Sequence, residues 1–121
     1  MGSIVLLSGG YDSALIAFRN PGTRALWIDY GQQSAAQEHQ QACALQRQLG
    51  FEMQTVSLQL QVNADRVACP VVPARNAVLL SIAANYTEPG DTILIGCNAA
   101  DQELFADCRL EFLEVMGCVL N

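Results

Sequence analysis

The sequence contains no lysine: its six basic residues are all arginine, against twelve acidic residues, for a formal charge of −6 over 121 residues. Non-specific binding to nucleic acid depends on Lys and Arg side chains that neutralise several phosphates, so a direct nucleic-acid partner is not expected. The sequence also has no basic N-terminal stretch and no apolar run near the ~20 residues that cross a bilayer. These absences predict a cytoplasmic protein with no membrane partner.

Paired cysteines are also missing. The cysteines are odd in number, are widely spaced and form no C-x-x-C pair, which excludes the usual zinc-site spacing and favours reduced thiols. They are Cys43, Cys69, Cys97, Cys108 and Cys118. A chain of this length buries enough surface to fold without a disulfide or a metal, so we expect one domain over residues 1–121 and no zinc.

Short apolar runs alternate with amphipathic segments along the chain. Strands are predicted at 3–7, 24–29, 51–58 and 91–96, and helices at 12–19, 34–49, from Pro73 onward, and at 105–116. In the second helix, Ser34 and Gln37 resemble a capping box, and His39 lies on the apolar stripe. This alternation predicts a three-layer α/β/α fold with a doubly wound parallel sheet.

The loop after the first predicted strand reads SGGYDS. Gly9 and Gly10 let the backbone turn and approach a ligand closely, and the N–H groups that begin the next helix point toward a common centre. Ser8 and Ser13 add hydroxyl donors. The loop therefore suits a phosphate group without needing a lysine; the alternative is a simple strand-to-helix turn capped by Asp12 or Ser13.

SGGYDS resembles the SGGxDS pyrophosphate-binding loop of the N-type ATP pyrophosphatases, the PP-loop superfamily, whose fold is adenine nucleotide alpha hydrolase-like. Those proteins cleave ATP between the α and β phosphates. The resemblance implies that the loop residues bind the pyrophosphate, with Tyr11 at the variable position. These residues are Ser8, Gly9, Gly10, Tyr11, Asp12 and Ser13.

Three further segments resemble blocks of the 7-cyano-7-deazaguanine synthase family in the same order: IDYGQ at 28–32, VPARN at 72–76 and IGCNAADQELFADCRLEF at 95–112. Members of that family adenylate 7-carboxy-7-deazaguanine with ATP, aminate it with ammonia to the amide and dehydrate the amide to the nitrile. The resemblance therefore implies ATP and Mg²⁺ as cofactors and a deazapurine carboxylate and ammonia as substrates.

The same resemblance implies roles for individual residues. ATP-binding residues would be the SGGYDS loop with Asp29, Tyr30, Gly31 and Gly96; catalytic residues would be Asp12, Ser13, Arg75 and Asp101; Mg²⁺ ligands would be Asp12 and Asp101. The deazapurine would meet Arg75, Asn76, Asp107, Arg109 and Phe112. Each has an ordinary structural alternative: a turn or cap for Asp101, a helix cap with surface charge for Arg75 and Asn76, an exposed ion pair for Asp107 and Arg109, and core packing for Phe112.

Three functional hypotheses follow. The first is a deazaguanine enzyme that makes the amide or the nitrile and completes its site through a homodimer or a partner subunit. The second is a nucleotide-binding subunit without turnover. The third is a tRNA-modifying PP-loop ATPase, which the acidic composition and the lack of a cysteine pair disfavour.

Overall fold

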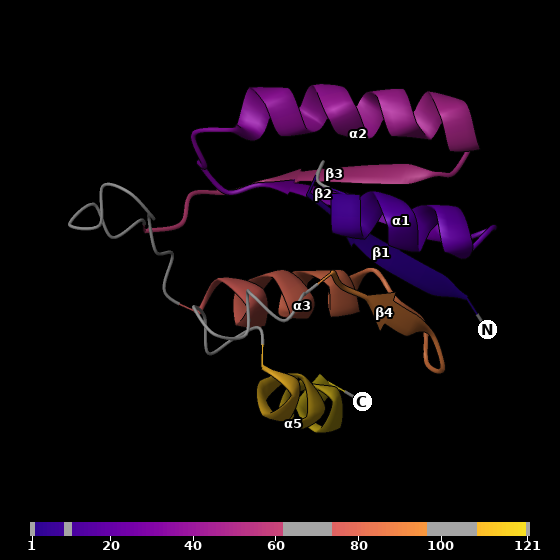
Figure 1. Cartoon of the computed structure of the whole chain (residues 1–121). Helices are drawn as coiled ribbons and strands as arrows, with labels where there is room; N and C mark the ends of the chain where they lie inside the picture. Colours follow the sequence, from indigo (N-terminus) through magenta and orange to yellow (C-terminus); the bar gives the residue numbers. More distant parts are fainter. Residues whose placement is uncertain (1, 9–10, 62–73, 97–108, 121) are drawn as a thin grey trace.

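The computed structural model describes residues 2–8, 11–61, 74–96 and 109–120. In these ranges the chain forms a four-stranded parallel sheet in the order β3-β2-β1-β4, with helices on both faces (Figure 1). The strands are β1 (Ser3–Leu7), β2 (Arg24–Asp29), β3 (Met53–Ser57) and β4 (Thr92–Leu94), and the helices are α1 (Tyr11–Arg19), α2 (Ala35–Leu49), α3 (Arg75–Asn85) and α5 (Leu110–Leu120). The predicted α/β fold is confirmed.

The two central strands are buried on both faces, which explains their continuous apolar runs. On one face, Val5 and Trp27 pack against α1 and α2 through Ala17 and Ala42. On the other face, alternate strand residues pack with α3, and α5 adds Leu113, Met116 and Leu120 at the edge of that cluster. A fully buried side chain of this kind contributes about 1.5–3 kcal/mol.

The outer strands are shorter than their sequence patterns predict. Strand β3 covers five residues instead of 51–58, and β4 covers three instead of 91–96. Among the described strands, β4 pairs with β1 alone, and its three residues lie opposite Ser3 to Val5. Apolar residues beyond the ladder, such as Ile95, still pack on the core.

Three helix predictions need correction. The helix expected at 105–116 begins outside the described residues; within them, α5 runs from Leu110 to Leu120 and so ends later than expected. Ser34 is the N-cap of α2 but makes no side-chain capping bond, because its hydroxyl bonds to Glu38 instead. His39 is exposed, although its ring lies 4.8 Å from that of Trp27 and covers the indole.

The strand order places a topological switch point beside β1. From β1 the chain moves through β2 to β3 on one side and then returns to β4 on the other side. The chain therefore leaves the neighbouring strands β1 and β4 in opposite directions, which opens a space at their carboxyl ends. In open α/β sheets this is where ligands bind.

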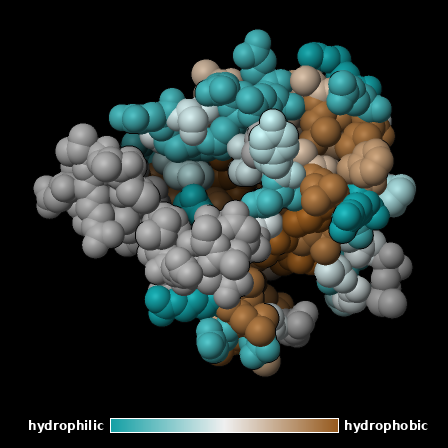
Figure 2. Space-filling model, viewed as in Figure 1, coloured by the Kyte–Doolittle hydropathy of each residue, from teal (hydrophilic) through white to brown (hydrophobic). Residues whose placement is uncertain are grey.

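The surface is uneven in character. In the view of Figure 2 the surface over α2 is mainly hydrophilic, whereas hydrophobic surface gathers around α1. On α1, Leu15 and Phe18 are exposed. Among the described helices, none combines the length and the apolar character that a membrane crossing requires.

Candidate active site

A cavity of about 220 Å³ lies at the carboxyl ends of β1 and β2. Its apolar floor includes Leu6, Ile28 and Leu79, which belong to or border the core of the sheet. Its polar wall comes from the loop after β1, from the loop after β2, and from the first turns of α1, α2 and α3. The polar residues are Ser8, Tyr11, Asp12, Ser13, Tyr30, Glu38, Arg75 and Asn76.

The loop after β1 is held together by its two serines. The backbone N–H of Ser8 donates to Oγ of Ser13 (3.1 Å), and the two hydroxyl oxygens lie 3.2 Å apart. Ser13 is buried and stands in the first turn of α1, whereas Tyr11 is 96% exposed at the cavity mouth. The N-terminus of α1 adjoins this loop, and the positive end of a helix dipole favours an anion nearby.

Gly96 brings the segment after β4 against α1. A Cβ added at Gly96 would lie 3.0 Å from Cβ of Asp12 and 3.2 Å from the backbone nitrogen of Ser13. Real Cβ atoms rarely come that close to other atoms. The absence of a side chain here therefore allows the two loops of the switch point to meet at the cavity.

The loop after β2 folds back on itself. The backbone N–H of Gly31 donates to the carboxylate of Asp29 (3.0 Å), and Gly31 has a φ of +92°. Leu58 and Leu60 donate to the carbonyls of Asp29 and Tyr30, which fastens the loop to the segment after β3. Tyr30 lines the cavity, whereas Asp29 and Gly31 shape the turn behind it.

Arg75 and Asn76 begin α3. Nε of Arg75 donates to Oδ1 of Asn76 (3.3 Å), and Asn76 is 2% exposed, so its amide is a fixed part of the cavity wall. The preceding Ala74 is the N-cap and has a φ of 54°, in the left-handed region. The turn at Ala74 sets the direction in which α3 presents its first two residues.

The structure gathers most of the expected site residues that it describes. Arg109 is exposed, and Phe112 packs half-buried against the core beside α3; neither belongs to the described lining of the cavity. Four expected site residues lie outside the described part of the chain: Gly9, Gly10, Asp101 and Asp107.

Glu38 is a cavity residue that sequence reasoning missed. Its only signal was an acidic side chain in the first turn of a helix that follows a polar loop, which is also the ordinary place for a solvated glutamate. Asp12 and Glu38 are the carboxylates among the described lining residues. Within the described ranges, no group of three or more His, Cys, Asp or Glu side chains gathers as a metal-binding cluster.

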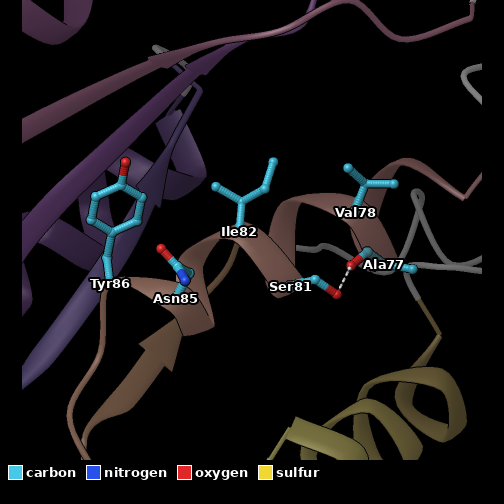
Figure 3. A pocket seen from close by; sticks show the side chains of 6 residues that line it. All are labelled: Ala77, Val78, Ser81, Ile82, Asn85 and Tyr86. Carbon is cyan, nitrogen blue, oxygen red and sulfur yellow. Dashed lines mark hydrogen bonds between the residues drawn. The ribbon is translucent and has the colours of Figure 1, made fainter.

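A larger hollow, of about 550 Å³, lies along one side of α3 (Figure 3). Its lining is mainly apolar and runs from Ala77 to Tyr86. The hydroxyl of Ser81 donates to the carbonyl of Ala77 (2.8 Å), so it is directed along its own helix. The described part of this lining includes no acidic or basic side chain, so the smaller cavity at the strand ends is the better candidate for chemistry.

Comparison with known proteins agrees with this geometry. A family model described as "Queuosine biosynthesis protein QueC" matches residues 2–121. The chain belongs to the QueC family. The expected resemblance is thereby confirmed at the level of the family.

Relatives of the chain carry the name 7-cyano-7-deazaguanine synthase. The protein from Pseudomonas paraeruginosa is 36% identical over 142 residues, which cover 98% of this chain and 63% of the relative. The one from Thiobacillus denitrificans is 37% identical with the same coverage. The one from Methanosphaerula palustris is 31% identical over 147 residues and is covered to 66%. The chain thus spans about two thirds of the length of these QueC-family relatives.

Proposed function

We propose that this QueC-family chain binds ATP in the cavity at the strand ends, adenylates the carboxylate of 7-carboxy-7-deazaguanine or a close analogue, and aminates it. The observation that carries the proposal is the joint placement of Ser8, Ser13 and the N-terminus of α1 around one cavity with Arg75 and Asn76. Relatives named 7-cyano-7-deazaguanine synthase support the choice of substrate.

The phosphates of ATP would meet the N-terminus of α1. Helix N-termini and close backbone N–H groups stabilise phosphate without a lysine, and the chain contains none. The hydroxyls of Ser8 and Ser13 are further donors on the same wall. In the transition state these fixed donors would stabilise charge that develops on the leaving pyrophosphate.

Arg75 and Asn76 would hold the acid substrate. A guanidinium donates to carboxylate or phosphate oxygens in a fixed geometry, and the bond to the buried Asn76 restricts the position of Arg75. The reaction needs a carboxylate oxygen in line with the α phosphorus while the bond to pyrophosphate breaks. Ammonia would then displace AMP from the acyl-adenylate to give the amide. A second adenylation, of the amide, would allow its dehydration to the nitrile.

The lining fits Mg²⁺ as the metal that accompanies ATP. Mg²⁺ is usually held by one or two carboxylates together with phosphate oxygens, and Asp12 lies on the wall beside Ser13. When bound, the metal would neutralise charge on the phosphate oxygens. Asp101, the second expected ligand, lies outside the described residues.

The wider setting is proposed on the same basis. We place the reaction in the cytoplasm, with AMP and pyrophosphate as products, and with a homodimer or partner subunit completing the site. The acidic composition argues against direct contact with nucleic acid. No zinc is proposed, because the cysteines lack a C-x-x-C pair.

Mass spectrometry after incubation with 7-carboxy-7-deazaguanine, ATP, Mg²⁺ and ammonium tests the proposal, since acid, amide and nitrile differ in mass. We expect amide or nitrile together with pyrophosphate. Asp12→Ala should lower pyrophosphate release at least ~100-fold through lost charge stabilisation. Glu52→Ala, an exposed carboxylate at the start of the β3 segment, is the matched control and should change it less than about twofold.

Pyrophosphate release without formation of the amide or the nitrile would contradict the proposed substrate. ATP binding without pyrophosphate release in the presence of any deazapurine carboxylate would favour the hypothesis of a nucleotide-binding subunit over that of an enzyme.

A further inference from the structure

Glu38 connects the first turn of α2 to the loop after β2. It is half-buried and lines the cavity. Its Oε1 accepts a hydrogen bond from Nε2 of Gln32 (3.2 Å), and its Oε2 accepts a short one from the hydroxyl of Ser34. Both carboxylate oxygens are thus bonded to the loop that precedes their own helix.

Gln32 is the centre of this arrangement. Its Oε1 accepts from the backbone N–H of Tyr30 (2.8 Å), and its Nε2 donates both to the carbonyl of Ile28 (3.2 Å) and to Glu38. One side-chain amide therefore joins the end of β2, the backbone of Tyr30 and the first turn of α2. The carboxylate of Glu38 acts together with the carbonyl of Ile28 and the N–H of Tyr30 to hold this amide in one orientation.

We propose that Glu38 is a positioning residue: through Gln32 it fixes the backbone of Tyr30 on the cavity wall, and with it the shape of the ATP site. This inference rests on the proposed function for its kinetic consequence. Its structural part, the coupling of Glu38 to Tyr30, does not depend on ATP. Glu38 acts on the site through another residue, so it is not a catalytic residue.

The core of α2 does not need this carboxylate. The helix is anchored to the sheet by Ala42, with Ala35 and Leu45 packed beside it, on the side chains around Trp27. Losing an acidic residue from the first turn costs only about 0.3–1 kcal/mol through the helix dipole. A small loss of stability is therefore expected in any case, and the test needs readouts that such a loss would not produce.

The first readout is hydrogen exchange at the backbone amide of Tyr30 in the full chain. In Glu38→Ala, Gln32 loses one acceptor and Tyr30 should exchange roughly fivefold faster, the change expected from weakening one hydrogen bond. Glu38→Gln keeps an oxygen acceptor for Gln32 and should stay near the wild type. Gln37→Ala, an exposed neighbour in the same turn, is the matched control and should have no effect.

The second readout is steady-state kinetics of pyrophosphate release. Glu38→Ala should raise KM for ATP roughly fivefold to twentyfold, with kcat within about threefold, because the binding site is loosened and the reacting groups remain. Gln32→Ala should do the same. The double variant should be no worse than either single one, since both changes break one pathway.

The proposed function and the positioning role of Glu38 are contradicted by different results. A wild-type chain that releases no pyrophosphate contradicts the proposed function and leaves the exchange test standing. Unchanged Tyr30 exchange in Glu38→Ala, or additive effects of the Glu38 and Gln32 changes, overturns the positioning role alone. A Glu38→Gln variant that fails like Glu38→Ala and needs tenfold more Mg²⁺ also overturns it, because the charge would then act on the metal.

Discussion

The two edges of the sheet use polar residues in different ways. At the amino edge, Asp91 binds partners from three segments: the backbone N–H groups of Gly2 (2.8 Å) and Glu88 (2.9 Å), and the guanidinium of Arg24 (3.0 Å). Arg24 also donates to the carbonyl of Tyr86 (3.1 Å). At this edge the charged side chains form hydrogen bonds and an ion pair within the protein, so the edge is closed by its own residues.

At the carboxyl edge the polar residues surround a cavity of about 220 Å³. Ser8 and Tyr30 come from two different loops and Arg75 from the first turn of α3, and all three line this cavity. The close approach of the loops depends on a missing side chain, at Gly96. The difference teaches that one edge is closed by its own side chains while the other keeps an open cavity, so substitutions at the two edges should affect different measurements.

The largest expected effect on activity comes from filling the gap at Gly96. In Gly96→Val the new side chain would meet Asp12 and the backbone of Ser13, and the first turn of α1 must shift. A displacement of about 1 Å at reacting groups costs on the order of 100-fold in rate. Pyrophosphate release should fall at least that much, while overpacking lowers the free energy of unfolding by only about 1–3 kcal/mol.

Gly96→Ala should lie between Gly96→Val and the wild type, which makes the series graded. The matched control is Gly117→Ala, where an added Cβ meets nothing within 4 Å. That change should stabilise α5 by about 0.5–1 kcal/mol and leave activity intact. Full activity in Gly96→Val would show that the carboxyl edge does not depend on this contact.

Asp91→Asn should reverse the pattern, with lower stability and unchanged chemistry. Hydrogen bonds from the backbone N–H groups of Glu88 and Gly2, followed by the charge of Arg24, lower the pKa of Asp91 below its ordinary value of 3.8. A lowered pKa in the folded state contributes stability above that ordinary value, and the contribution is lost as pH falls through the folded value.

Thermal unfolding at pH 7 and near pH 3 checks this prediction. The variant should melt below the wild type at pH 7. The difference should shrink near pH 3, because below the ordinary pKa of 3.8 the unfolded chain binds a proton at Asp91 more readily than the folded chain does. Turnover per folded molecule should stay within about twofold. An equal melting difference at both pH values would mean that the charge of Asp91 contributes nothing.

Much of the fold was predictable because buried segments must consist of apolar residues, which the sequence shows directly. The central strands matched their predicted ranges, 3–7 and 24–29, since a strand covered on both faces must be apolar throughout. The outer strands were overestimated, because the alternation at 51–58 and the apolar run at 91–96 indicate burial and not the length of a hydrogen-bonded ladder. Strand β4 ends at Leu94, yet Ile95 continues to pack on the core.

The position of the cavity was predictable where a local pattern marks it, as at Ser8 and Ser13. It was not predictable where two elements must first meet. Ser34 and Gln37 matched a capping box, but the hydroxyl of Ser34 bonds to Glu38, which Gln32 also binds. Such a choice depends on the path of the loop between β2 and α2, and spacing along the sequence does not contain that path.

The smallest expected effect concerns Ala74, at the carboxyl edge before α3. Among the described residues it is the non-glycine residue with a positive φ, 54°. Ala74→Gly removes a strain of about 1–2 kcal/mol but adds about 0.4–1 kcal/mol of unfolded-chain entropy. The free energy of unfolding in urea should therefore rise by about 0–1.6 kcal/mol. Ala77→Gly, inside α3, has only the entropic cost and should lose about 1 kcal/mol. Equal losses in the two variants would mean that the turn presenting Arg75 and Asn76 stores no strain, and the carboxyl edge would then be as relaxed as the closed one.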